Sequence, residues 1–169
     1  MYKKDDIIMY GTSGVCRVVG MIERDFGGTS HPYYQLQPVY DEKSTLFVPL
    51  ENPALVEKMH GVLSADAVEE LLHTTPEQQP AWIADEASRK QHYKEILEGD
   101  DRKALICAIK ALYRHRQSCR EEGKKLHVCD ERFLKDAERI LYDELAFVLK
   151  IDRDKILGYI LSKLDNATA

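Results

Sequence analysis

The sequence predicts an α+β protein in which a short β-rich amino-terminal part precedes a longer helical part. Before about residue 50, runs rich in Ile, Val, Tyr and Phe alternate with Gly, Ser, Thr and Pro, which is typical of strands joined by tight turns. Beyond Asn52-Pro53 the apolar residues recur every three or four positions, which is the period of an α-helix. We therefore expect a first domain over residues 1–55 and a second over 56–169.

The first domain is expected to contain four strands. The expected ranges are 7–10, 15–22, 33–40 and 45–50. Gly11-Thr-Ser-Gly14 predicts a turn, and residues 25–32, with Gly27-Gly28, predict a loop. Pro38 has no N–H to donate, so it favours an edge strand or a strand end. Four short strands without an intervening helix indicate a small twisted barrel or sheet.

The second domain is expected to be an all-α helical bundle. The expected helices run from a cap at Ser64 to before Pro76, over 82–97, 102–121 and 130–149, and from a cap at Asp152 to Leu164. Gly99 and Gly123 are expected to end two of them, and Asp100 or Asp101 to begin the helix over 102–121. The helix over 130–149 has the most regular apolar spacing, so we expect it at the centre of the core, and the short loops predict antiparallel neighbours. The polar tail from Asp165 is expected to fray.

Composition excludes several classes of protein. No apolar run reaches the ~18 to 20 residues that a membrane span needs, and Met1-Tyr-Lys-Lys-Asp-Asp lacks the apolar region of a signal peptide, so we expect a cytoplasmic protein with no membrane partner. The four cysteines form no Cys-x-x-Cys pair and the six histidines no His-x-x-x-His pair. We therefore expect buried, reduced thiols and no metal site.

The sequence contains none of the common catalytic motifs. It has no Gly-x-Ser-x-Gly, no Walker loop and no Gly-x-Gly-x-x-Gly, and Gly11-Thr-Ser-Gly14 lacks the lysine of a phosphate loop. The acidic pairs Asp100-Asp101 and Asp143-Glu144 fit helix caps and solvated helix faces better than a catalytic dyad. We predict that the protein is not an enzyme, with no cofactor and no small-molecule substrate.

Charge is distributed unevenly along the chain. The net charge is −5, yet residues 102–125 hold eight basic and only two acidic side chains. Within that segment Lys103, Lys110 and Arg114, at i, i+7 and i+11, share one stripe of the predicted helix. Three aligned cations suit a phosphate backbone, and an ordinary solvated helix face is the alternative.

Trp82 is the only tryptophan, and two interpretations of it are open. A single tryptophan is most simply an anchor of the core. Alternatively, its exposed ring packs against an unstacked base step, while Arg89, Lys90 and Lys94 on the following turns hold phosphates.

Several segments along nearly the whole chain form a recognisable set. They are Asp6-Ile-Ile-Met-Tyr-Gly-x-x-Gly-Val15, Val19-Gly-Met-Ile-Glu23, Tyr33-Tyr-Gln-Leu36, Phe47-Val-Pro-Leu-Glu-Asn52, Trp82, Tyr93, Glu98-Gly-Asp100, the run from Lys124 to Glu138, and Leu141-Tyr-Asp-Glu-Leu-Ala146. This set resembles the CarD/CdnL family of bacterial transcription regulators. The amino-terminal module of that family is shared with the transcription-repair coupling factor.

The resemblance implies a Tudor-like antiparallel β-barrel that docks on the β subunit of RNA polymerase. It also implies that the helical domain contacts promoter DNA at the upstream edge of the melted region, largely without sequence readout, and so alters the stability of the open complex. Trp82 would be the wedge, with Arg89, Lys90 and Lys94 beside it. The family often carries arginines near the positions of Asp25 and Phe47, where the nearest cation here is Arg24.

We expect the polymerase to bind Arg24 and the last strand of the barrel, whose edge offers unpaired backbone groups to a partner strand. The residues of that strand are Thr45, Leu46, Phe47, Val48 and Pro49. We expect the protein to act as a monomer. An interpretation from another class stays open, in which the barrel binds a peptide, the helices serve as a scaffold, and the protein is an adaptor that does not bind DNA.

Overall fold

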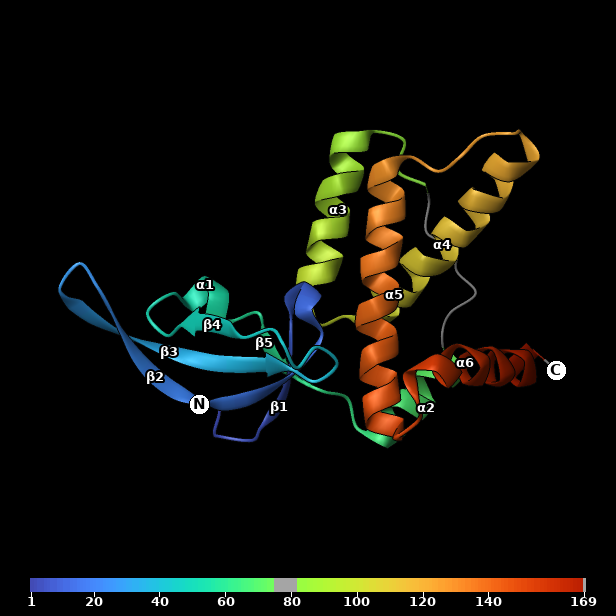
Figure 1. Cartoon of the computed structure of the whole chain (residues 1–169). Helices are drawn as coiled ribbons and strands as arrows, with labels where there is room; N and C mark the ends of the chain where they lie inside the picture. The colour runs from blue at the N-terminus through green and yellow to red at the C-terminus, as the bar shows by residue number, and fades with distance from the viewer. Residues whose placement is uncertain (75–81, 169) are drawn as a thin grey trace.

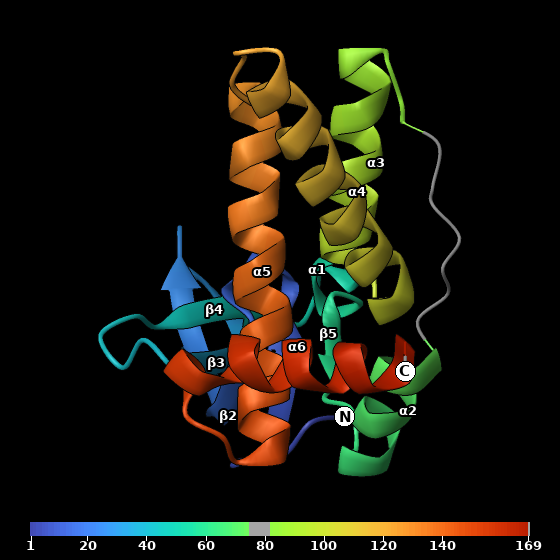
Figure 2. The same cartoon turned by 90° about the vertical axis from the view of Figure 1, so that its right-hand side faces the viewer.

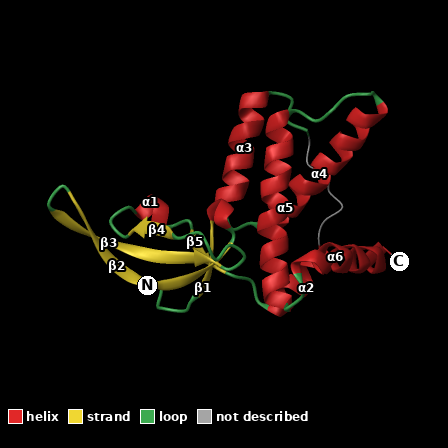
Figure 3. Ribbon diagram, in the orientation of Figure 1, coloured by secondary structure: helices red, strands yellow, loops and turns green. Residues whose placement is uncertain are grey.

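The computed structural model describes residues 1–74 and 82–168, and it shows an α+β fold with a sheet followed by a mostly helical region (Figures 1 and 3). The strands are β1 (Ile7–Tyr10), β2 (Val15–Phe26), β3 (Thr29–Pro38), β4 (Leu46–Pro49) and β5 (Met59–Gly61). They form one antiparallel sheet in the order β4-β3-β2-β1-β5, so β4 and β5 are its edges. The predicted fold class is confirmed.

Strands β2 and β3 form a long hairpin where the sequence predicted a loop. Pairing continues through Asp25↔Ser30 to Phe26↔Thr29, so only Gly27-Gly28 remains as the turn. Both glycines have positive φ, 63° and 84°, which a two-residue hairpin turn requires. The loop over 25–32 was therefore a wrong prediction, because two turn residues are enough to reverse the chain. The hairpin projects away from the helices at the left of Figure 1.

The remaining differences in the sheet lie at its edges. Strand β5 was missed because three residues are too few to show an alternating pattern, yet Met9 pairs with His60 and Tyr10 with Met59. Strand β4 is shorter than expected and excludes Thr45 and Leu50. Pro38 is the last residue of β3, as predicted, and the turn over 11–14 is confirmed as a short 3₁₀ helix, η1 (Gly11–Ser13).

The helices confirm most of the predicted ranges. They are α1 (Pro53–Val56), α2 (Ala65–Thr74), α3 (Glu86–Glu98), α4 (Arg102–Glu121), α5 (Val128–Leu149) and α6 (Arg153–Thr168). The short α1 was not predicted, and α6 remains helical to Thr168, where fraying was expected. Helix α3 begins after Trp82 rather than at it, because the Asp85 carboxylate caps the helix by accepting the N–H of Ser88 at 2.9 Å.

Two of the predicted N-terminal caps are formed, at Ser64 and at Asp101. The Ser64 hydroxyl accepts the N–H of Ala67 at 3.1 Å, and the Asp101 carboxylate accepts that of Ala104 at 3.0 Å. Gly99 ends α3, and Gly123 follows α4 with a φ of 71°. The Ser64 and Asp101 side chains accept backbone N–H groups that the first helical turn leaves unpaired, and so they fix where α2 and α4 begin.

Helix α5 is the centre of the core, as its spacing predicted. Its buried side chains include Phe133, Ala137, Ile140, Leu141 and Leu145. In Figures 1 and 2 it runs beside α3 and α4 and reaches α6 at its far end. Met9 and Val15 from the sheet belong to the same apolar cluster, whereas a smaller cluster lies within the sheet itself. One core therefore joins the sheet to the helices.

The interpretation of Asp143 and Glu144 as solvated-face residues was wrong, because both are buried, at 4% and 1% exposed. Glu144 lies in the apolar stripe of α5, where Arg102 of α4 donates to it from Nε at 2.9 Å and from Nη2 at 2.8 Å. The N–H of Leu63 donates to the same carboxylate at 2.9 Å. A charge survives in a core when it is paired and hydrogen-bonded in this way.

Candidate functional site

The edge strand β4 offers a backbone edge and an aromatic surface. Its inner neighbour is β3, with Val48 opposite Tyr34 and Phe47 opposite Gln35. Val48 is fully buried, whereas Leu46, Phe47 and Pro49 are half-buried and Thr45, just before the strand, is exposed. The outer edge of β4 has no strand partner in the described sheet, so its backbone groups can pair with another chain.

The structure brings the expected polymerase-binding residues Arg24 and Phe47 together. The Arg24 guanidinium lies over the Phe47 ring, 3.8 Å from its centroid, although the two residues lie on β2 and β4. This cation–π contact holds a positive charge on an apolar surface next to the free edge. The neighbouring hairpin carries two further exposed apolar side chains, Met21 and Phe26, which the sequence did not single out.

Trp82 is neither a core anchor nor fully exposed. Its side chain is 38% exposed, and one face of its ring stacks on His115 of α4 at 3.8 Å between centroids and 16° between planes. Arg89 lies over the ring at 4.8 Å from its centroid. The indole is thus held on a platform built by α3 and α4, and part of it faces solvent.

Arg89 is buried, and its donors are used within the protein. It bonds Asp130 of α5 from Nε at 2.8 Å and from Nη2 at 3.2 Å, and its Nη1 donates to the carbonyl of Ile83 at 3.1 Å. Tyr93 adds a hydroxyl hydrogen bond to Asp130 at 2.8 Å and stacks on Phe133. Arg89 therefore fixes the segment after Trp82 to α5, and its guanidinium does not point outward to a phosphate.

These contacts shift the protonation equilibria in a consistent direction. Burial raises the pKa of Asp130, but hydrogen bonds from Arg89 and Tyr93 outweigh it, and the net pKa is below the ordinary aspartate value. The hydrogen bond to Asp130 raises the pKa of Arg89, and burial with the same carboxylate raises that of Tyr93. The network is a permanent ion pair with a neutral tyrosine.

Lys90 and Lys94 lie on a different side of α3 from Trp82. Both are exposed, and they line a cavity of about 470 Å³ whose floor includes Tyr93 and Phe133 and which lies between α3 and α5. Trp82 instead lines a much smaller hollow between α3 and α4. The Lys90 ammonium is paired with Glu86 at 2.6 Å. The structure therefore does not bring the two lysines and the tryptophan together.

The basic stripe of α4 is only partly confirmed as a surface feature. Lys103 and Arg114 are exposed, and Lys110 is half-buried. The apolar residues Leu105, Ile109 and Leu112 on the other side of α4 are buried. Among the side chains that the structure describes, none of the three cations forms an ion pair.

Sequence reasoning missed the residues that position Trp82. His115 and Asp130 carry no local signal for this role, because each reaches Arg89 or Trp82 from another helix, 33 to 41 residues away. Such contacts follow from helix packing, which a single sequence does not reveal. The acidic residue in the first turn of α5 was visible in the sequence, but it fits helix-end electrostatics as well as an ion pair.

The comparison with protein families agrees with the sheet geometry. Residues 2–60 match the family model of the CarD-like/TRCF RID domain, which covers β1 to β4 and reaches into β5. A search among curated proteins found no match. No helix in the described part of the chain is long and apolar enough to cross a membrane.

The matched domain indicates the general role of the sheet. Its family implies binding to RNA polymerase and a role in transcription, and transcription factors of this kind are usually non-catalytic. The match bears out the resemblance in the amino-terminal segments. The chain therefore carries a CarD-like/TRCF RID domain at residues 2–60.

Proposed function

We propose that the protein regulates transcription by docking its sheet on the β subunit of RNA polymerase and by contacting promoter DNA through its helices. The observation that carries the proposal is the CarD-like/TRCF RID domain at residues 2–60, whose edge strand β4 is open to pairing. The contact with DNA lies at the upstream edge of the bubble and changes the lifetime of the open complex.

The dock combines backbone pairing with a small apolar surface. A strand of the β subunit adds to the outer edge of β4, over Thr45 to Pro49, and main-chain hydrogen bonds provide affinity. The Arg24–Phe47 pair lies next to that edge and supplies one charge and one aromatic face. This arrangement takes the place of the more basic docking surface that the family often shows.

Trp82 is the best candidate for the contact with DNA. One face of its ring is fixed by His115, so the exposed part meets a base step without losing further side-chain freedom. Arg89 serves as a positioning residue, whereas Lys94, Lys103, Lys110 and Arg114 are the cations available to phosphates. Lys90 joins them once it leaves Glu86. Docking raises the local concentration of these groups at the promoter, so a few weak contacts suffice.

The decisive experiment measures the lifetime of open promoter complexes with the full chain and its Trp82→Ala variant. We expect the variant to bind polymerase normally but to return the lifetime to the value without the protein. His115→Ala is the matched control, because it removes the same stacking contact but keeps the tryptophan. We expect His115→Ala to retain a clear part of the effect.

The same experiment separates the proposal from the adaptor interpretation. If Trp82→Ala leaves the lifetime unchanged at equal polymerase binding and equal folding, the helices act only as a scaffold. The dock is tested by retention of the full chain on the purified β subunit, which Phe47→Ala and Arg24→Glu should reduce. Lys155→Glu, an exposed position on α6, is the control that should bind normally. Normal retention of both dock variants would contradict the proposed surface.

A further inference from the structure

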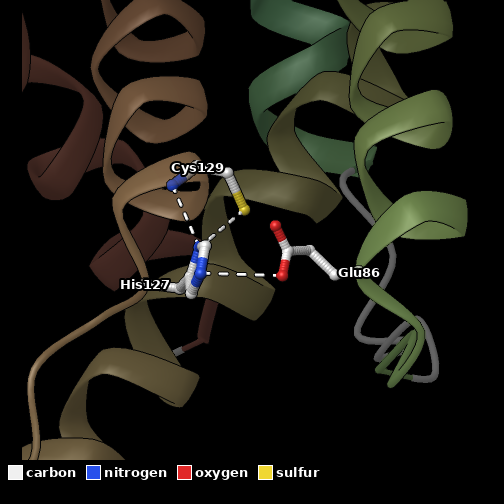
Figure 4. Close-up of side chains that lie close together, drawn as sticks. All are labelled: Glu86, His127 and Cys129. Carbon is white, nitrogen blue, oxygen red and sulfur yellow. Dashed lines mark hydrogen bonds and ion pairs between the residues drawn. The ribbon is translucent and has the colours of Figure 1, made fainter.

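The starts of α3 and α5 bring three potential metal ligands together. Figure 4 shows Glu86 on the first turn of α3 facing His127 and Cys129 at the start of α5. One ligand atom from each residue lies within 4.8 Å of those of the other two. His127 Nδ1 is 3.1 Å from Cys129 Sγ, and His127 Nε2 is 3.6 Å from Glu86 Oε2.

We propose that Glu86, His127 and Cys129 bind one zinc-class divalent ion, with water as the fourth ligand. A thiolate, an imidazole and a carboxylate are the three ligand types that zinc takes in proteins. Zinc bonds of about 2.0 to 2.3 Å in tetrahedral geometry place ligand atoms roughly 3.3 to 3.8 Å apart. An ion binds only one ring nitrogen of His127, whereas the 3.1 Å and 3.6 Å separations involve its two different nitrogens. Taken one atom per residue, the three ligand atoms lie within 4.8 Å of one another, so side-chain rotations have to bring them closer to a single ion.

The side chains have the freedom to make these rotations. Glu86 and His127 are 46% and 52% exposed, and Cys129 is half-buried rather than buried as the sequence suggested. Lys90 occupies only one carboxylate oxygen of Glu86, Oε1, so Oε2 stays directed at His127. His127 gives up one long hydrogen bond, in which its Nδ1 accepts the Cys129 N–H at 3.3 Å.

The second cation near the site, Arg89, does not prevent binding of a dication. Arg89 Nη2 is 3.9 Å from Cys129 Sγ. Its charge is already balanced by the Asp130 carboxylate at 2.8 Å. Metal binding releases the thiol proton and uses a neutral imidazole.

A second histidine–cysteine pair provides an internal comparison. His115 Nε2 lies 3.6 Å from Cys119 Sγ on α4. Across residues 1–74 and 82–168, however, only the Glu86, His127 and Cys129 group reaches three converging ligands. The carboxylate from a different helix therefore distinguishes the proposed site from a chance pair, and a bound ion would fix the start of α3 to that of α5.

The test is a titration of the reduced, metal-free full chain with Co²⁺, followed by displacement with Zn²⁺. We expect one equivalent to bind, with the visible bands of tetrahedral cobalt and a near-ultraviolet thiolate-to-cobalt charge-transfer band. Cys129→Ser should abolish the charge-transfer band, and the matched variant Cys119→Ser should retain it. Glu86→Gln and His127→Ala should each lose at least roughly tenfold in affinity, because even groups behind a ligand cost that much when removed.

Three results would overturn the site, provided that circular dichroism shows equal folding of the variants. The first is no cobalt binding by the wild type. The second is a charge-transfer band that survives Cys129→Ser or disappears in Cys119→Ser. The third is unchanged affinity in Glu86→Gln, which would leave only a histidine–cysteine pair. The proposal does not depend on the function proposed for the sheet.

Discussion

Asp130 is the residue on which the position of Trp82 depends. It is 1% exposed and holds Arg89, which in turn bonds the backbone just after Trp82. Asp130→Asn leaves a buried guanidinium without a counter-charge, so we expect the free energy of unfolding to fall by about 3 kcal/mol or more. Urea denaturation followed by Trp82 fluorescence measures this, with exposed Lys155→Ala as the neutral control. A loss no larger than in the control would mean that the ion pair contributes little.

Asp143 gives the pH dependence that this protein should show. Burial raises its pKa, against the opposing effect of Arg153 and Arg139. The pKa of Asp143 in the folded state is above the unfolded value of about 3.9. The contribution of its protonated carboxyl to the free energy of unfolding is therefore fully present below that value, and it is lost as the pH rises through the folded-state pKa. Asp143→Asn removes this titration together with the ion pair to Arg153 at 2.6 Å, so the stability of the variant relative to wild type should rise from acid to neutral pH. A difference that stays constant with pH would contradict this account.

At the scale of elements, the sequence predicted what depends on local periodicity and caps. The stripes of α4 and α5 and the caps at Ser64 and Asp101 were found because each signal lies within one or two turns of helix. Strand β5 and the platform under Trp82 were not predicted, because the residues that pair with them are distant in the chain. Glu144 shows the limit most clearly, since the sequence assigned it to a solvated helix face and only its pairing with Arg102 explains why a charge lies in the core.

The β2–β3 hairpin depends on its two turn glycines. Gly28 has a φ of 84°, a conformation that an alanine side chain adopts only with strain. Gly28→Ala should therefore lower the free energy of unfolding by about 1 to 2 kcal/mol. Gly61→Ala is the matched control, because a Cβ there meets nothing within 4 Å and φ is not positive. Equal stability losses in the two variants would show that backbone strain is not the cause.

At the scale of the whole molecule, the sheet and the helices share one apolar core and several hydrogen bonds, and they are not joined by a linker alone. Met9 and Val15 pack in the helical core, and Arg102 joins α4 to Glu144 of α5 and to the carbonyl of Gly61 in β5. Arg139 of α5 also donates to the carbonyl of Thr12 in η1. A dock on the sheet and a contact on the helices are thus held in a fixed relation, which the proposed function needs.

This shared structure predicts that the chain unfolds as one cooperative unit. Arg102→Ala leaves Glu144, 1% exposed, without its cation, so we expect about 3 to 5 kcal/mol less stability. The loss should reach both parts, because the same arginine binds β5 and α5. Hydrogen exchange read by mass spectrometry should show faster exchange in the peptides of β1 and β2 and in those of α5 to the same extent, with coincident urea transitions. If the helical peptides lose protection while those of the sheet keep it, the two parts unfold separately and the Arg102 contact does not couple them.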